Sequence, residues 1–156
     1  MSIPGSVYII NPQSGKALDV EGAGTGNSTK VQLYEQNRTV AQKWVIASDG
    51  SIINPNSGKA LDVSGGGTAN GTQIQIYERN GTGAQKWVLN PDGSIINPQS
   101  GKALDVSGGG TTNGTKIQIY ALCGYIDTHI DDIHFQPLLV TLTGHTPHSS
   151  QCEMYT

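Results

Sequence analysis

Three types of polar side chain recur along this chain in one order and at one spacing. An ionised Asp accepts hydrogen bonds from two neighbouring hydroxyl groups, a Gln amide both donates and accepts them, and a Tyr ring offers a flat apolar face. Together these groups suit a shallow site for a sugar, with hydrogen bonds to hydroxyls and packing against C–H groups. The residues are Asp19, Gln32, Tyr34, Asp62, Gln75, Tyr77, Asp105, Gln118 and Tyr120.

The spacing comes from an internal repeat of 43 residues. A segment that starts at Ile9 and ends in Leu-Asp-Val occurs three times at this period. A Gln-Lys-Trp-Val segment starts at Gln42 and again at Gln85, but its third copy would fall at Thr128, where the sequence does not match. Such self-similarity is typical of units that bury their apolar faces against one another. The expected units are about 5–48, 49–91, and 92–120 continuing into the tail.

Each unit carries about four short β-type runs separated by Gly, Pro, Asn or Asp, and none has the 3.6-residue apolar spacing of a helix. Asp49-Gly50 and Asp92-Gly93 are typical of tight hairpin turns with positive φ. One unit alone cannot bury its apolar face, so we expect the copies to close around a shared axis as an all-β fold. In the first unit the strands are expected at 7–11, 16–20, 30–34 and 43–47.

Alternation along a strand predicts which side chains face the core. In the third run of the first unit, Val31 and Leu33 go inward, so Gln32 and Tyr34 share the opposite face. In the second run the flanking aliphatic residues go inward and Asp19 points out. We therefore expect every unit to present one Asp, one Gln and one Tyr to solvent.

The repeated unit, with its Leu-Asp-Val, Gln-x-Tyr and Gln-x-Trp segments, resembles the repeat of ricin B-type lectins, which also occurs as a carbohydrate-binding module on glycoside hydrolases. The resemblance covers about 5–120 and implies a β-trefoil with up to three sites for galactose, lactose, N-acetylgalactosamine or xylan-type sugars. The implied partners are glycans or glycoproteins, and no cofactor is implied. Carried over position by position, the carbohydrate-binding residues are Asp19, Gln32, Tyr34, Asn37, Gln42, Asp62, Gln75, Tyr77, Asn80, Gln85, Asp105, Gln118 and Tyr120.

Some of these assignments depart from the family pattern. The family often has an Asn before the Gln of Gln-x-Trp, whereas this chain has Ala41 and Ala84, so Asn37 and Asn80 are carried as substitutes. Two roles stay open for the Gln residues of both copies, either contact with the sugar or bonding of backbone beside it. The Trp residues of both copies are expected in the core.

Composition argues against several other functions. Charged residues make up 13% of the chain and the formal net charge is −3, without the basic cluster that nucleic-acid binding needs. No apolar stretch approaches the length of a membrane span, and the start lacks the features of a secretory signal, so we expect a cytoplasmic protein, with leaderless release as an option. The repeats contain no His, no Cys and no carboxylate pair placed as in a glycosidase, which indicates a protein that is not an enzyme.

Two other functions stay open as alternatives, and the oligomeric state stays unassigned. A β-trefoil can bind proteins through its loops, as a protease inhibitor does. The chain can also be a carbohydrate-binding module detached from a glycoside hydrolase.

Similarity between the units stops after Tyr120, which makes 121–156 a divergent tail. The abrupt change suggests a frame shift, a retained intron or an alternative exon. The third unit then lacks its Trp and its last strand, for which 130–135 or 138–143 is a candidate replacement. The tail also holds four His residues, Cys123 and Cys152, whose spacing matches no zinc pattern, so no metal site is predicted.

Overall fold

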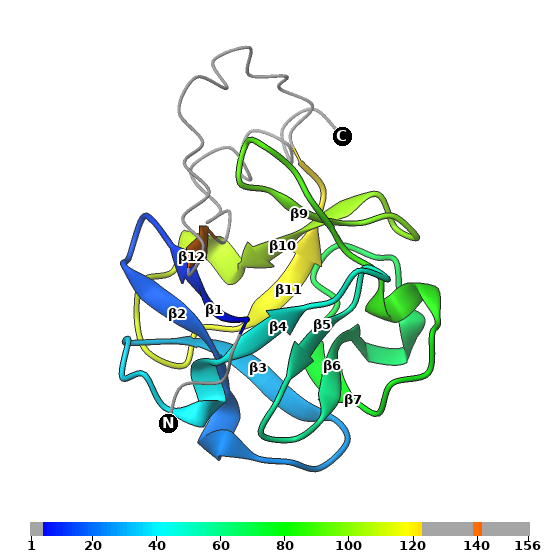
Figure 1. Ribbon diagram of the computed structural model, residues 1–156. Helices are drawn as coiled ribbons and strands as arrows, with labels where there is room; N and C mark the ends of the chain where they lie inside the picture. Colours follow the sequence, from blue (N-terminus) through cyan, green and yellow to red (C-terminus); the bar gives the residue numbers. More distant parts are fainter. Residues whose placement is uncertain (1–4, 123–138, 142–156) are drawn as a thin grey trace.

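The computed structural model describes residues 5–122 and 139–141, and these residues form strands and short 3-10 turns without any α-helix (Figure 1). The all-β prediction is therefore confirmed. No helix in the described part of the chain is long and apolar enough to cross a membrane. The expected hairpin turns are also present, since Gly50 and Gly93 have φ of 92° and 90°.

The strands follow the 43-residue period of the sequence. The first unit contains β1 (Ser6–Asn11), β2 (Lys16–Val20), β3 (Thr29–Tyr34) and β4 (Trp44–Ile46). The second contains β5 (Ile52–Asn54), β6 (Lys59–Val63), β7 (Ile74–Tyr77) and β8 (Val88–Leu89). The third contains β9 (Ile95–Asn97), β10 (Lys102–Val106) and β11 (Ile117–Tyr120), and β12 (Leu139–Thr141) lies in the tail. The 3-10 turns are η1 (Glu21–Ala23), η2 (Val40–Gln42), η3 (Ser64–Gly66), η4 (Gly83–Gln85) and η5 (Ser107–Gly109).

The second and third strands of each unit pair in the same antiparallel register. In β2 and β3, Asp19 lies opposite Gln32, and the corresponding Asp and Gln lie opposite each other in β6–β7 and β10–β11. Because a shift of one residue would turn the aliphatic side chains away from the core, the alternating pattern holds this register. Each hairpin therefore brings one carboxylate beside one amide.

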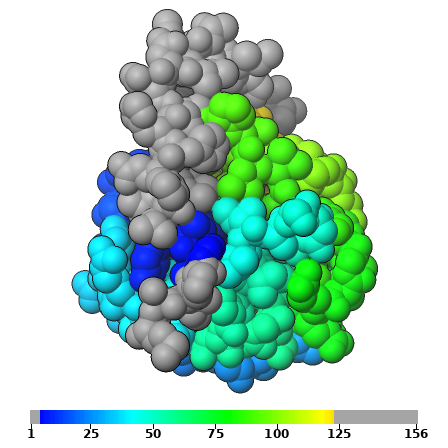
Figure 2. Space-filling view, in the orientation of Figure 1, coloured from blue at the N-terminus to red at the C-terminus, as the bar shows by residue number. Residues whose placement is uncertain are grey.

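The units close on one another. The strands β1-β2-β3-β7-β6-β5-β4 form a ring that the β1–β4 pairing closes, and β11-β10-β9-β8 form a second sheet. The loop between the second and third strands of each unit donates a backbone hydrogen bond to a neighbouring unit. These bonds run from Ser28 N to Ile76 O, from Gly71 N to Ile119 O and from Gly114 N to Leu33 O. Since each unit both gives and receives one such bond, the three form a cyclic arrangement, and Figure 2 shows the first two as one continuous surface.

The core lies where the units meet and consists of Ile, Leu, Val and Ala side chains together with both Trp residues. Trp44 and Trp87 are 0% and 3% exposed, so their predicted core position is confirmed. Each indole Nε1 donates a hydrogen bond of 3.1 Å to a backbone carbonyl of its own unit, Leu18 O and Leu61 O respectively. The Trp residue thus ties the end of each of these units to its second strand.

Within the part of the chain that the structure describes, the first strand of the first unit, β1, has a pairing partner in the tail, unlike the first strands of the other two units. β4 and β8 pair antiparallel with the first strand of the following unit, whereas β1 pairs in parallel with β12, with Tyr8 opposite Leu139 (Figure 1). Of the two replacement strands proposed from the sequence, 138–143 contains β12, and 130–135 lies outside the described residues. Cys123, Cys152 and the four His residues also lie outside them.

Candidate functional site

The centre of each candidate site is the Asp that the second strand carries. Its side chain points away from the aliphatic core residues, as predicted, but it is buried. Asp19, Asp62 and Asp105 are 4%, 5% and 3% exposed, so the prediction that they are presented openly to solvent was wrong. In the first two units the reason is tertiary, because side chains from the third strand and from the Gln-x-Trp segment lie against the carboxylate.

The Gln on the third strand makes the first of these contacts. Gln32 Nε2 donates to Asp19 Oδ1 over 3.0 Å, and Gln75 Nε2 donates to Asp62 Oδ1 over the same distance. In the third unit Gln118 Nε2 donates to Asp105 Oδ2 over 2.9 Å. All three pairs follow from the strand register, because the two residues lie directly opposite each other.

The Gln of the Gln-x-Trp segment makes the second contact. Gln42 Nε2 donates to Asp19 Oδ2 over 2.9 Å and to Glu35 O over 2.8 Å, and its Oε1 accepts from Asn37 N over 3.0 Å. Gln85 makes the same three bonds in the second unit. Both amides are buried, at 0% and 2% exposure, and both of their N–H groups are used. Of the two roles left open by the sequence, this geometry favours orienting the carboxylate and the loop.

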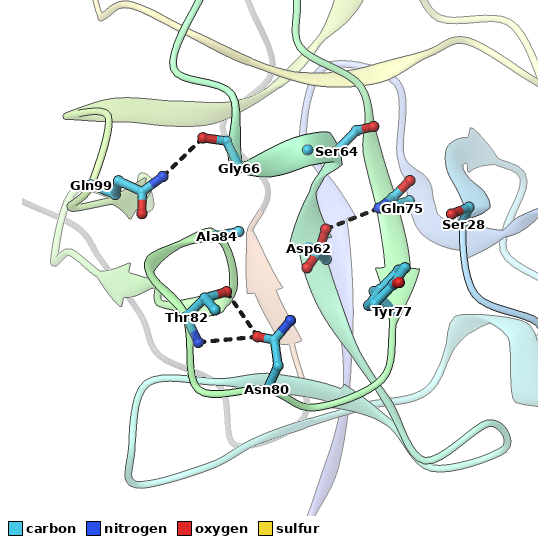
Figure 3. Close-up of a pocket in the computed structure, with 11 residues that line it drawn as sticks. Ser28, Asp62, Ser64, Gly66, Gln75, Tyr77, Asn80, Thr82, Ala84 and Gln99 are labelled. Carbon is cyan, nitrogen blue, oxygen red and sulfur yellow. Dashed lines mark hydrogen bonds between the residues drawn. The ribbon is translucent and has the colours of Figure 1, made fainter.

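Asn37 and Asn80 lie on that loop and face the same space as the carboxylate. Asn80 Oδ1 accepts hydrogen bonds from Thr82 N and Thr82 Oγ1, and Asn37 is held in the same way by Thr39. Within the described residues the Asn80 Nδ2 group has no protein partner, and Figure 3 shows it directed toward Asp62. The loop therefore presents a hydrogen-bond donor to the site.

These groups line a cavity in each of the first two units. The second-unit cavity has a volume of about 440 Å³ and is lined by Asp62, Gln75, Tyr77 and Asn80 among others (Figure 3). The first-unit cavity is about 320 Å³ and is lined by Asp19, Gln32, Tyr34 and Asn37 among others. Both Tyr side chains are half-buried and border the cavity. The structure thus brings together, in two units, an acceptor, a donor and an aromatic ring.

The third unit has only part of this set within the described residues. Asp105, Gln118 and Tyr120 occupy the expected strand positions, with Asp105 and Gln118 buried and Tyr120 half-buried. The position of the second Gln is Thr128 by the repeat period, and it lies outside the described residues.

Burial changes the acidity of all three carboxyl groups. It raises the pKa of Asp19 and Asp62 above the usual value, and the hydrogen bonds from two Gln residues to each carboxylate act in the opposite direction. Burial raises the pKa of Asp105 to about 7, against the lowering effects of Gln118 and of the Val106 backbone. Because burial disfavours the ionised form of a carboxyl group, the large shift at Asp105 makes its charge the hardest of the three to keep. The first two sites are therefore better suited to presenting an ionised acceptor at neutral pH.

Several residues near the sites were not predicted from the sequence. Ser28 from the first unit and Gln99 from the third line the second-unit cavity, and only contact between units places them there. Thr39 and Thr82 also line the cavities, and the repeated Asn-x-Thr spacing was the signal that could have pointed to them. In the described part of the chain no group of three or more metal-binding side chains occurs.

Comparison with known proteins gives a consistent result. The sequence profile of the ricin-type beta-trefoil lectin domain matches residues 5–127. A search of curated proteins gave no match. Among solved structures, the designed 3-fold symmetric protein ThreeFoil is 34% identical with a TM-score of 0.72, over 78% of this chain and 92% of that one.

Two natural proteins are also similar. An exo-beta-1,3-galactanase from Clostridium thermocellum is 28% identical with a TM-score of 0.72, over 80% of this chain but 29% of that one. The C-half of an earthworm R-type lectin, solved in complex with GalNAc, is 21% identical with a TM-score of 0.66, over 86% of this chain and 93% of that one. The profile match spans most of the chain and agrees with the strands and buried Trp residues described above. This chain therefore belongs to the ricin-type beta-trefoil lectin domain family.

Proposed function

We propose that the chain binds glycans at the sites of its first and second units and does not transform them chemically. The observation that carries the proposal is the carboxylate held on both oxygens by amides, as in Asp62 with Gln75 and Gln85. An ionised carboxylate has about four acceptor positions, so two remain after these bonds. They are available to two neighbouring hydroxyl groups of a sugar ring.

The rest of each site complements this acceptor. The Asn80 Nδ2 group donates toward the same space, and a sugar hydroxyl can accept from it while donating to the carboxylate. Tyr77 offers an aromatic face for the C–H side of a pyranose. The first unit offers the same set with Asn37 and Tyr34. Each site therefore suits a single ring with adjacent hydroxyls.

We further propose galactose-type glycans, including N-acetylgalactosamine, as the ligands, with xylan-type glycans as the second choice. The similar earthworm lectin was solved with GalNAc, and another similar natural protein is an exo-beta-1,3-galactanase. Two sites on one scaffold would raise the avidity for a multivalent surface by roughly 10² to 10⁴ where the geometry permits. Multivalent display would then compensate for weak single sites.

A glycan array on the purified chain tests this proposal. We expect binding to galactose-type glycans that disappears in the double variant Asp19→Asn/Asp62→Asn, because Asn keeps the shape of Asp but not the charged acceptor. Loss of the charged hydrogen bonds at one site should weaken that site by about 10- to 100-fold.

The matched control is Asp92→Asn, which changes a carboxylate that accepts from Ser94 in a turn. It should bind like the unaltered chain. A folded chain that binds no glycan, or a double variant that binds as well as the control, would contradict the proposal.

The comparison with the galactanase favours one related function. Because this chain matches 29% of that protein, it corresponds to one portion of a larger enzyme, and it can serve as a carbohydrate-binding module for a hydrolase. A catalytic domain encoded beside this segment would support that role, and a gene that encodes the binding unit alone would count against it.

A further inference from the structure

The two cavities are not equivalent, although the units that form them are close copies. The second-unit cavity is larger, about 440 Å³ against about 320 Å³, and residues from both neighbouring units border it. Gln99 comes from the third unit and Ser28 from the first. In Figure 3 these two side chains lie on opposite sides of Asp62. The second site is thus extended beyond the Asp, Tyr and Asn group.

Gln99 is held in a defined position at one end of this cavity. Its Nε2 donates to Gly66 O over 3.0 Å, and its side chain passes over Gly83. A Cβ placed on Gly83 would lie 2.9 Å from Gln99 Cδ, closer than real Cβ atoms approach, and would collide with its Oε1. Gln99 can therefore occupy this place only because residue 83 is Gly.

The first unit has a different pair at the corresponding positions. Val40 corresponds to Gly83, since Val40 O accepts from Asn54 Nδ2 just as Gly83 O accepts from Asn97 Nδ2. Asn56 corresponds to Gln99 by the repeat period and is shorter by one methylene. Within the described residues it makes no hydrogen bond to the first unit and does not line the first cavity. At this end, therefore, the second cavity is lined by the Gln of a Gly–Gln pair, whereas the first cavity is not lined by the Asn of the corresponding Val–Asn pair.

The other end of the second cavity also differs. Ser28 has a φ of 71°, and the residues at its position in the other units are Gly71 and Gly114. Ser28 N donates to Ile76 O over 2.8 Å, which places the side chain at the edge of the cavity. The second site thus carries a hydroxyl group where the corresponding loop residue facing the first site has no side chain.

We propose that the second site binds two linked sugar residues, one at Asp62 and the next against Gln99, whereas the first site binds only one. This inference rests on the proposed function of glycan binding. In the proposed complex the first ring binds the carboxylate of Asp62. The Gln99 amide lies to one side of that carboxylate (Figure 3), so a second ring linked on that side would reach the amide. Because the amide is already held by Gly66, little side-chain entropy is lost when a sugar binds it.

Single-site chains test the proposal. Asp19→Asn/Asp105→Asn leaves the second site, and Asp62→Asn/Asp105→Asn leaves the first. Each is titrated calorimetrically with galactose and β-1,3-galactobiose, and in parallel with xylose and xylobiose. We expect the disaccharide to bind the second site about 3- to 10-fold more tightly than the monosaccharide, as one or two added hydrogen bonds would give, and the first site to show a ratio near 1.

Three variants make the test specific. Gln99→Asn should bring the ratio at the second site to about 1. Val40→Gly/Asn56→Gln, which copies the second site into the first, should raise the ratio there. Gln13→Asn changes the corresponding residue of the first unit, which donates to Gly109 O, and should leave the ratio at the second site unchanged.

The outcomes separate this inference from the proposed function. If neither single-site chain binds any of the four sugars while folded, glycan binding fails and the inference fails with it. If both sites bind sugar with the same ratio, or if Gln99→Asn keeps the ratio high, glycan binding stands and the inference is overturned. If Ser28→Gly removes the preference and Gln99→Asn does not, the assignment to the Gln99 end is wrong.

Discussion

The second and third units carry the same Asp–Gln pair in the same strand register, yet of these two only the second has the Asn-bearing loop and the second Gln within the described residues. The difference is the Gln-x-Trp segment. Gln85 connects Asp62 to the loop that carries Asn80, and Trp87 anchors the segment in the core. A hairpin is therefore enough to pair a carboxylate with an amide, but the cavity needs a loop from a later part of the unit.

The same contrast occurs where the units join. Asn54 and Asn97 each donate through Nδ2 to two carbonyl groups of the preceding unit, one at the start of its second 3-10 turn and one at the Lys of the Gln-x-Trp segment. Asn11 is the corresponding residue of the first unit and is 1% exposed, but its Nδ2 has no partner among the described residues. The junction between the third and first units thus lacks, in the described structure, two bonds that the other junctions have.

The largest expected effect concerns the buried indole that the third unit does not have. Trp87→Ala should lower the free energy of unfolding by about 3 to 5 kcal/mol, because it removes a buried aromatic ring and leaves a cavity. Chemical denaturation followed by circular dichroism measures the loss. Trp87→Phe is the control and should cost less, since most of the apolar volume remains. A cost below about 1 kcal/mol would mean that the Trp residue is not what distinguishes the second unit.

The next effect should stabilise the protein. The pKa of Asp105 is raised to about 7 from an unfolded value of about 3.9, so its contribution to stability is fully present below pH 4 and is lost as the pH rises through 7. Asp105→Asn removes this loss and should raise the free energy of unfolding at pH 8 by an amount on the order of 3 kcal/mol.

Denaturation at pH 4 and pH 8 checks the sign of this prediction. At pH 4 the variant and the unaltered chain should be equally stable, because Asp105 is then protonated in the folded state. Asp62→Asn should gain less at pH 8, because both oxygens of Asp62 accept from Gln amides, whereas Asn can accept through one oxygen only. If both variants gained the same free energy of unfolding at pH 8, the carboxyl groups of the second and third units would not differ in the way proposed.

The smallest expected effect is a difference in stability between variants at two junctions between units. Asn54→Ala and Asn11→Ala both remove an Oδ1 that accepts from a Ser three residues later. Only Asn54 also donates from Nδ2 to Val40 O and Lys43 O, over 3.0 Å in each case. Asn54→Ala should therefore cost about 1 to 2 kcal/mol more than Asn11→Ala. Equal costs in thermal or chemical denaturation would show that the β1 junction is as well bonded as the others.

The repeat pattern was sufficient to predict the parts of the molecule that depend on neighbours in sequence. The strands of the first unit lie within about two residues of their expected bounds, and Trp44 and Trp87 are in the core. These features follow from alternation and from turns between adjacent strands, which act over a few residues.

The remaining features depend on contacts between distant segments, which no local pattern contains. Asp19 and Asp62 are buried because Gln42 and Gln85, 23 residues later in each case, lie against them. Gln99 reaches the second site from another unit because Gly83 leaves room for it. The parallel pairing of β12 with β1 could not be predicted from the 43-residue repeat, because β12 lies in the tail, which does not share that repeat. Each of these features depends on which distant segments the folded chain brings within hydrogen-bonding distance.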